Sequence, residues 1–449
     1  MPKDILDERL TSIDKAGGAN LKCERASLAG AVSQRACVFC GARVVLNPIV
    51  DAFHLVHGPI GCASYTWDIR GSLSAGSELY RQSFCTDLRE KDVIFGGVDK
   101  LRAGIKEIAT IYKPPAIFIY ATCVVGVIGD DVEAVAREAE AAYGLRVIVI
   151  KAPGFAGHKA QGYRLAGDAL SKLLGPKKPE RKIRGINILG DYNLAGEMWI
   201  VKDYFREIGL PVVASFTGDS TCADLLKAPA AALNVVQCAG SMTYFAKRLE
   251  EDFGIPWIKA SFFGLEDTAR ALKETVDLLG GPEERRRAGA LIERESKKAT
   301  AAIAPYLPGL AGKKAAIFVG GGFKAISLIR QFKALGLSTV LVGTQTGQKE
   351  EYEVMASLVD PGTVILDDAN PSELEAFMRE KGADVLVGGV KERPLAYKLG
   401  VAFCDHNHER QSPLAGFVGV ENFAKEINLT VNSPVWGHVR AAAGAFNRP

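Results

Sequence analysis

Short runs of apolar, mostly β-branched residues alternate along the chain with segments whose apolar positions recur at helical spacing. An apolar run without polar alternation is typical of a strand buried on both faces, and the segment after it is typical of a covering helix. This alternation predicts an α/β fold of Rossmann-like domains with mostly parallel sheets. The strands are expected at Ala116–Cys123, Val147–Ala152, Ile186–Asn193, Val212–Gly218, Val235–Gly240, Trp257–Phe263, Ala315–Gly322, Thr339–Gly343, Val364–Asp368, Val385–Val390 and Val401–Asp405.

Two charged stretches interrupt the pattern. Leu174–Arg184 is basic and contains two prolines, and Gly280–Lys298 reads as a charged helix opened by Gly-Gly-Pro. Such stretches are typical of boundaries between domains. We therefore expect an N-terminal tail and three α/β domains, at residues 1–25, 26–183, 184–300 and 301–449.

Composition narrows the class of protein. The 449 residues are 48% hydrophobic and 24% charged, with a net charge of +3, so no basic surface for nucleic acid is expected. The most apolar run, Ala116 to Gly129, is shorter than the roughly 20 residues that cross a bilayer. Residues 1–19 carry no continuous apolar segment of the secretory kind. We expect a cytoplasmic protein without a membrane or nucleic-acid partner, in which the nine cysteines serve metal or redox chemistry better than disulfides.

Glycines close several of the expected strands. Gly190–Asn193, Gly320–Gly322 and Gly388–Gly389 all fall at carboxyl ends, the edge of an open α/β sheet where ligands bind. None has the spacing of a dinucleotide or phosphate loop, and tight strand-to-helix turns are the plainer interpretation.

Three cysteines lie at transitions between elements. Cys37, Cys62 and Cys123 could project toward a shared point, where nearby glycine N–H groups could bond to sulfur. The pair Cys37 and Cys40 has no second Cys-x-x-Cys partner, so an iron–sulfur cluster is favoured over zinc. Three thiols do not complete a four-thiolate site, and either Cys40 or another chain could supply the fourth ligand.

Cys238 ends a strand in the second domain and is expected to point into a cleft, as a nucleophile or as the ligand of a second cofactor. The remaining cysteines can simply pack as small hydrophobic residues, and the roles of Cys40 and Cys85 stay open. They are Cys23, Cys40, Cys85, Cys222 and Cys404.

Long motifs, ordered over nearly the whole chain after about residue 30, resemble the nitrogenase component 1 (MoFe protein) superfamily. The resemblance is to its α-type subunits, and most of all to those of the scaffold on which the iron–molybdenum cofactor is matured. The motifs are Cys37–Arg70, Cys85–Gly97, Thr122–Asp131, Gly190–Trp199, Val236–Ser241 and Cys404–Trp436.

The resemblance implies three domains around a cofactor cleft, with two metal sites. Cys37, Cys62 and Cys123 would hold an interfacial iron–sulfur cluster, [4Fe-4S] or P-cluster-like [8Fe-7S], completed by a homologous β-type subunit in an α2β2 heterotetramer. Cys238 would bind one end of a larger [8Fe-9S-C] cofactor or its precursor, with or without molybdenum and homocitrate. An ATP-dependent iron-protein reductase would supply electrons.

Departures from the catalytic pattern favour a scaffold over dinitrogen reduction. Ala415 stands where the catalytic subunit has its molybdenum-binding histidine, Tyr163 where it has a histidine beside the cofactor, and Lys324 in place of an arginine. Lys324 is a cofactor-binding candidate. Whether the chain is an enzyme stays open, because a nitrogenase-like reductase that cleaves the C–S bond of methylthio-alkanes would share the cysteines.

Three histidines are further candidates. His406 and His408 follow a strand and could approach the open end of the cofactor, although alternating polar residues there are also typical of a solvated loop. His57 precedes Cys62 in a His-Gly-Pro turn, where it could hydrogen-bond near the cluster or serve the fold alone.

Overall fold

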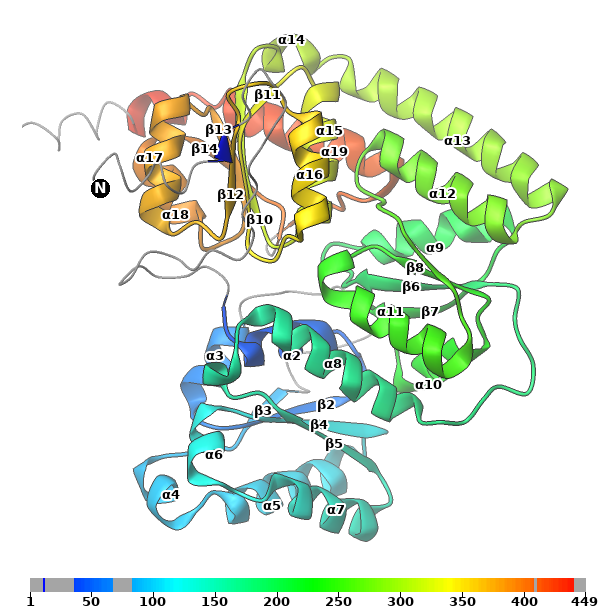
Figure 1. Ribbon diagram of the computed structural model, residues 1–449, viewed down its shortest axis with the longest axis vertical. Coiled ribbons are helices and arrows are strands. Elements are labelled where there is room, and N and C mark those ends of the chain that lie inside the picture. The colour runs from blue at the N-terminus through cyan, green and yellow to red at the C-terminus, as the bar shows by residue number, and fades with distance from the viewer. Residues whose placement is uncertain (1–10, 13–35, 68–82, 408–409, 440–449) are drawn as a thin grey trace, which may run out of the picture. The chain divides into compact units, whose positions relative to one another are not determined.

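The chain folds into two compact units (Figure 1), each described here by itself. The structure, a computed structural model, describes residues 11–12, 36–67, 83–407 and 410–439. The cysteine unit consists of Ala36–Lys259 and Leu278–Gly281. The C-terminal unit contains Ala260–Asp277, the described residues after Gly281, and residues 11–12.

Two four-stranded sheets, parallel throughout, form the framework of the cysteine unit. The first has the order β3-β2-β4-β5, with β2 (Phe53–His57), β3 (Ser83–Cys85), β4 (Ala116–Ala121) and β5 (Arg146–Lys151). The second has the order β7-β6-β8-β9, with β6 (Ile186–Asp191), β7 (Val212–Thr217), β8 (Leu233–Val236) and β9 (Trp257–Lys259).

Helices connect these strands, and their ends follow local sequence signals. In α7, for example, the Asp131 side chain accepts a hydrogen bond from the Ala134 N–H at the start, and left-handed Gly144 ends the helix. The helical segments are α2 (Val38–Leu46), α3 (Ile60–Trp67), α4 (Glu90–Phe95), α5 (Val98–Glu107), η2 (Ile108–Tyr112), α6 (Cys123–Ile128), α7 (Val132–Tyr143), η3 (Gly154–Ala156), α8 (Lys159–Leu174), α9 (Glu197–Ile208), α10 (Cys222–Leu225), η4 (Ala228–Ala230) and α11 (Ala239–Phe253).

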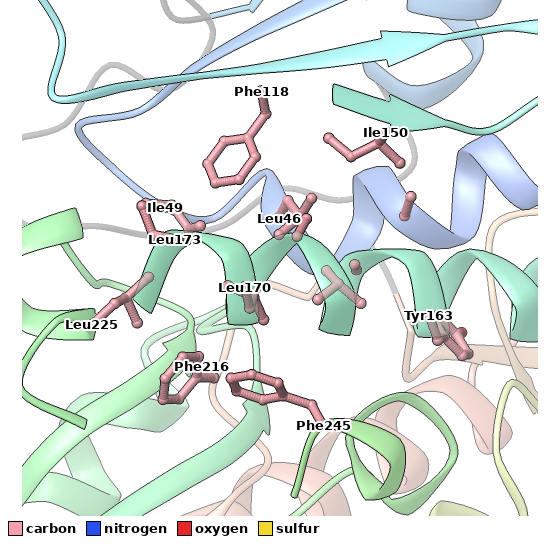
Figure 2. Packing of buried hydrophobic residues seen from close by; sticks show 14 of the residues in the cluster. Leu46, Ile49, Phe118, Ile150, Tyr163, Leu170, Leu173, Phe216, Leu225 and Phe245 are labelled. Carbon is pink, nitrogen blue, oxygen red and sulfur yellow. The ribbon is translucent and has the colours of Figure 1, made fainter. Parts of the chain in front are cut away.

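Helix α8 joins the two sheets through one shared core. Figure 2 shows Leu170 of α8 between Phe118 and Ile150 of the first sheet on one side, and Phe216 and Phe245 of the second sheet's layer on the other. The aromatic pair Phe216 and Phe245 meets at a centroid distance of 4.9 Å. Because one helix buries apolar side chains against both sheets, the cysteine unit has a continuous core.

Two glycines let α2 and α8 approach backbone to backbone. A Cβ atom on Gly41 would collide with the carbonyl oxygen of Lys159, and one on Gly162 would collide with the carbonyl oxygen of Val38. Both obstacles are backbone atoms of the opposite helix, which cannot move aside as a flexible side chain can. This contact therefore fixes the start of α2, where Cys37 is the N-cap residue, against α8.

A six-stranded sheet with the order β1-β12-β11-β10-β13-β14 forms the C-terminal unit. Every pairing is parallel except that of β1 with β12. Helices α15 and α16 cover one face and α17 and α18 the other (Figure 1). The elements are β1 (Thr11–Ser12), α12 (Leu265–Leu279), α13 (Pro282–Ile303), α14 (Leu307–Leu310), β10 (Lys314–Val319), α15 (Gly322–Ala334), β11 (Ser338–Thr344), α16 (Lys349–Leu358), β12 (Val364–Asp367), α17 (Pro371–Lys381), β13 (Val385–Gly388), α18 (Arg393–Leu399), β14 (Ala402–Asp405) and α19 (Gly416–Val431).

The α/β fold class expected from the sequence is confirmed, with three mostly parallel sheets. Each expected strand is present within a few residues of its expected bounds, and the charged stretch after Gly280 forms α13. The strands β1, β2 and β3 were not expected. The domain boundaries stay a prediction. No helix among the described residues is long and apolar enough to cross a membrane.

Replacing Gly162 tests the close contact of the two helices. We expect Gly162→Ala to lower the free energy of unfolding by about 2 kcal/mol or more, because the added methyl group overpacks two rigid backbones. Gly289→Ala on α13 is the matched control, since a Cβ there meets no atom within 4 Å. It should raise the stability by about 0.5–1 kcal/mol. Urea unfolding of both variants measures the two changes in the free energy of unfolding. Equal changes would contradict the close contact of the two helices.

Candidate functional site

Three elements of the cysteine unit bring the thiols of Cys37, Cys62 and Cys123 to one region. Cys37 caps α2, Cys62 lies in the first turn of α3, and Cys123 is the first residue of α6, directly after β4. Strands β2 and β4 are neighbours, so the segments that follow their carboxyl ends, with Cys62 and Cys123, start from the same edge of the sheet. The sequence predicts the three cysteines at transitions between elements, and in the structure each lies at or near the start of a helix.

Gly154, in the turn after β5, lies against two of these cysteines. Its N–H donates a hydrogen bond to the Cys123 sulfur at 3.0 Å. A Cβ atom at this position would lie 3.1 Å from that sulfur and 3.3 Å from the Cβ of Cys37. Because residue 154 has no Cβ atom, its backbone can come close to both cysteine side chains. Its N–H can then stabilise a thiolate at Cys123.

The three thiols also influence one another electrostatically. Burial raises the pKa of the Cys37 and Cys62 thiols, and the charge of Cys123 raises both further. Such mutual repulsion makes three thiolates at this place favourable only beside a cation. No group of three His, Cys, Asp or Glu side chains in the described parts of the chain is arranged to hold a single metal ion.

A buried network holds the loop that leads to Cys62. The Thr122 side chain hydrogen-bonds to the Cys62 thiol and donates to the carbonyl of His57 at 3.1 Å. The His57 ring bonds to Thr86 and to Asp130, each at 3.0 Å. Burial lowers the pKa of His57, although the hydrogen bond to Asp130 opposes this. His57 thus positions the loop. Its two ring nitrogens bond to Thr86 and Asp130 rather than to a cysteine thiol.

The other cysteines have separate surroundings. Cys40 is buried on α2 beside Val44. Cys222 is buried next to Asp51, and buried Cys404 donates to Glu426 at 3.2 Å. Cys85 ends β3, where its sulfur accepts from the Asp87 N–H at 3.3 Å. Cys23 lies outside the described residues.

Cys238 lies at the carboxyl edge of the second sheet of the cysteine unit. It follows β8 and is the N-cap residue of α11. Left-handed Gly190 at the end of β6 makes room for it, because a Cβ there would lie 2.8 Å from the Cys238 nitrogen. The Gln237 N–H donates to the Leu189 carbonyl at 2.8 Å, which extends the pairing of β6 and β8 by one bond. The thiol is half-buried, as a binding residue at an open sheet edge requires.

Lys324 and His406 lie together at the carboxyl edge of the C-terminal unit's sheet. Lys324 is in the first turn of α15, and its ammonium group lies 3.2 Å from the His406 carbonyl and 5.4 Å from the Phe263 ring centroid. Before it, a Cβ atom on Gly320 or Gly321 would meet nothing within 4 Å. Packing against the described residues therefore does not explain these two glycines.

The environment of His406 differs from a solvated loop. Its side chain is fully buried between Phe263 and Phe423, and among the described residues neither ring nitrogen has a hydrogen-bond partner. Burial lowers the pKa of His406 well below its usual value, and the charges of Lys324 and Arg410 add to this. The imidazole is therefore neutral. His408 lies outside the described residues.

A buried acid, Glu392, precedes the last strand of the same sheet. Glu392 accepts a hydrogen bond from the Gly389 N–H at 2.8 Å, while its other oxygen has no partner among the described residues. Burial raises the pKa of Glu392 to about 7, and the charge of Asp405 adds to this. The group therefore titrates near neutral pH.

Three residues of the thiol region were not singled out from the sequence: Thr122, Gly154 and Arg43. Thr122 stands between a strand and Cys123, where a Thr is typical of a helix N-cap, so this signal was readable. The contacts of Gly154 and Arg43 come from segments distant in the sequence, and no local pattern reveals them.

Comparison with known proteins covers nearly the whole chain. Residues 37–432 match the family described as nitrogenase component 1 type oxidoreductase. The chain is 62% identical over 442 residues to the nitrogenase iron-molybdenum cofactor biosynthesis protein NifE of Clostridium pasteurianum, with 97% of each chain covered. The NifE of Methanosarcina barkeri is 49% identical over 452 residues, covering 97% of this chain and 98% of its own. A solved structure described as "Nitrogenase Cp1 at pH 5" superposes with a TM-score of 0.89 at 29% identity, covering 97% of this chain and 96% of its own.

Glu392 predicts a pH-dependent stability. Its pKa is about 7 in the folded chain against an ordinary value of 4.5, so ionisation opposes folding. The penalty is absent below pH 4.5, grows as the pH rises to 7, and then stays constant at about 3 kcal/mol. We expect Glu392→Gln to raise the urea midpoint clearly at pH 8 and little at pH 5. The exposed Glu380→Gln is the control, and an equal gain for Glu392→Gln at both pH values would contradict the assignment.

Proposed function

The chain belongs to the nitrogenase component 1 family, and from this premise we propose that it is a scaffold on which the iron–molybdenum cofactor is assembled. The observation that carries the proposal is the 62% identity, over 97% of both chains, to a protein named for that biosynthesis. The relatives favour this function over reduction of methylthio-alkanes. The two thiol sites described above would then have different tasks.

Cys37, Cys62 and Cys123 would hold a resident iron–sulfur cluster. The donor set fits such a group, because three thiols share one region, repel one another as thiolates, and include one sulfur that accepts a backbone N–H. When bound, the cluster would accept and pass on electrons. Cys40 is buried beside Val44, so the remaining ligand is assigned to a β-type subunit.

Exposed apolar side chains around the thiols support this partner. Ile60 next to Cys62 is 59% exposed, Phe155 next to Gly154 is 66% exposed, and Val127 on α6 is 76% exposed. Large apolar residues concentrated around half-buried thiols mark an interaction surface. We assign this surface to a homologous β-type subunit, in an α2β2 heterotetramer whose cluster lies at the interface.

A second apolar surface lies on α4, which packs against α6. Ile94 and Phe95 are strongly exposed there. Because α6 begins at Cys123, a protein bound to α4 would lie one helix away from the cluster ligand. We assign α4 to the ATP-dependent iron-protein reductase that delivers electrons.

The cargo is the larger iron–sulfur cofactor or its precursor, to which molybdenum and homocitrate are added. Cys238 supports its attachment through one thiolate. In the C-terminal unit, Lys324 supplies a positive charge, His406 a neutral imidazole, and Gly321 open space. Ala415, at the position of the catalytic subunit's histidine, is fully buried and offers no ligand. Few permanent ligands suit a protein that must release its product.

Removing one of the three thiols should lower the iron content of the protein. We expect Cys123→Ala to lose the resident cluster and weaken assembly with the β-type subunit, since an open iron site is labile and a link between subunits is gone. Iron analysis and electron paramagnetic resonance of the anaerobically purified complex measure this. The control Cys40→Ala should keep its iron. An unchanged spectrum in Cys123→Ala would show that the thiol is structural.

Cys238→Ala should separate the two iron sites. It is expected to keep the resident cluster and lose most of the cargo, because Cys238 is the thiolate assigned to the cargo. A folding defect would instead reduce both. Iron quantification, followed by extraction of the cargo into an organic solvent, distinguishes these outcomes. Full cargo occupancy in Cys238→Ala would refute the attachment.

Lys324 should contribute to cargo retention without being essential. Its ammonium group would make a charge-assisted hydrogen bond to an anionic cargo, worth about 1.5–3 kcal/mol. Lys324→Ala is therefore expected to weaken retention about tenfold to a hundredfold, while Lys324→Arg keeps most of it. Dilution of the loaded complex followed by iron analysis gives the retention. Equal loss in both variants would argue against a role of the charge.

A further inference from the structure

A cavity of about 430 Å³ lies in the cysteine unit beside the three-thiol region. Helix α3, which carries Cys62, forms one wall with Ile60, Ala63 and Ser64, and the edge strand β3 forms another. The β3 residues are Ser83, Phe84 and Cys85, and Arg43 reaches the cavity from α2. A volume of this size accommodates a small organic molecule.

Arg43 is the unusual member of this lining. Only 3% of the residue is exposed, and one guanidinium nitrogen, Nη2, donates to the Ser83 hydroxyl at 2.7 Å. Among the described residues, Nε and Nη1 have no hydrogen-bond partner, and no carboxylate forms an ion pair with the group. Guanidinium stays charged even when buried, so this position carries a positive charge that nothing in the described chain compensates.

The ionisable groups beside Arg43 carry no negative charge at neutral pH, because burial raises the pKa of Tyr120 and of the Cys85 thiol, although Arg43 opposes both shifts. The Tyr120 ring lies under the guanidinium at 5.5 Å, and its hydroxyl is 2.8 Å from Nδ1 of His54. Burial lowers the pKa of His54 well below its usual value, so its ring is neutral. An anion in the cavity would therefore supply the missing negative charge.

We propose that this cavity binds a small organic carboxylate. The carboxylate would accept a hydrogen bond from the Ser83 hydroxyl, which itself accepts from Arg43, and its charge would offset that of the guanidinium. Ala63 and Phe84 would cover the hydrocarbon part. A single cation suits a monoanion better than a phosphate dianion, which usually meets several donors. The proposal does not depend on the assembly function.

Cys85 makes the proposal measurable because its half-buried thiol lines the same cavity. Iodoacetate carries a carboxylate, whereas iodoacetamide is its neutral analogue. A thiolate without a neighbouring anion site reacts more slowly with iodoacetate, because the two negative charges repel each other. At Cys85 we expect the opposite preference, with a rate that saturates as the iodoacetate concentration rises.

The experiment treats the full chain, purified anaerobically, with each reagent and follows Cys85 by peptide mass spectrometry. Sodium butyrate should protect Cys85 from iodoacetate and inorganic phosphate should not. Arg43→Met should reduce the iodoacetate-to-iodoacetamide rate ratio at Cys85 about tenfold or more. An unchanged ratio in Arg43→Met would overturn the site, and equal protection by phosphate would overturn the assignment to carboxylates.

A second variant keeps the test valid if Arg43→Met folds poorly. Ser64 is exposed at the cavity wall, so Ser64→Trp can fill the cavity while Arg43 stays in place. It should abolish butyrate protection and saturation, and circular dichroism should match the unmodified chain. Retained butyrate protection in a folded Ser64→Trp variant would place the anion elsewhere and refute the proposal.

Discussion

The close packing of α2 on α8 is the constraint on which the cysteine unit depends. Gly41 and Gly162 allow the two backbones to touch, and α8 at the same time fills the core between both sheets. Because Cys37 caps α2, a displacement of this helix would move one of the three thiols. The position of that thiol is thus set by a contact between two residues without side chains.

Electrostatics impose the second constraint, since both units bury polar groups that the described residues leave incompletely satisfied. In the cysteine unit this group is the guanidinium of Arg43. In the C-terminal unit they are the His406 ring and Glu392. Buried polar groups without partners cost stability, so their presence points to ligands that provide the partners. A scaffold that takes up and releases cargo fits this arrangement.

Much of the fold could be predicted from apolar runs, because buried parallel strands consist of them. Strand β2 was missed since its sequence contains His54 and His57, which break the apolar run. Both are buried nonetheless: Nδ1 of His54 bonds to Tyr120, and the His57 ring bonds to Thr86 and Asp130, all from other segments. Sequence patterns cannot reveal partners that only the folded chain brings near.

The candidate site likewise combines features that the sequence predicts with features that it does not. The positions of Cys37, Cys62 and Cys123 at element ends were predictable, because strand ends and helix starts have local signals. The burial of His406 was not, since Phe263 and Phe423, distant in the sequence, enclose it. For the same reason Arg43 gave no signal as a lining residue of a cavity.

If the proposed function holds, one iron population stays with the protein while another passes through it. A complex of this chain with the proposed β-type subunit, labelled with radioactive iron, would be mixed with molybdate, homocitrate, the iron-protein reductase with ATP, and a cofactor-free nitrogenase. Part of the label is expected to move to the nitrogenase and restore its activity, while the remainder stays on the complex. Retention of all label on the complex, with no nitrogenase activity restored, would contradict it.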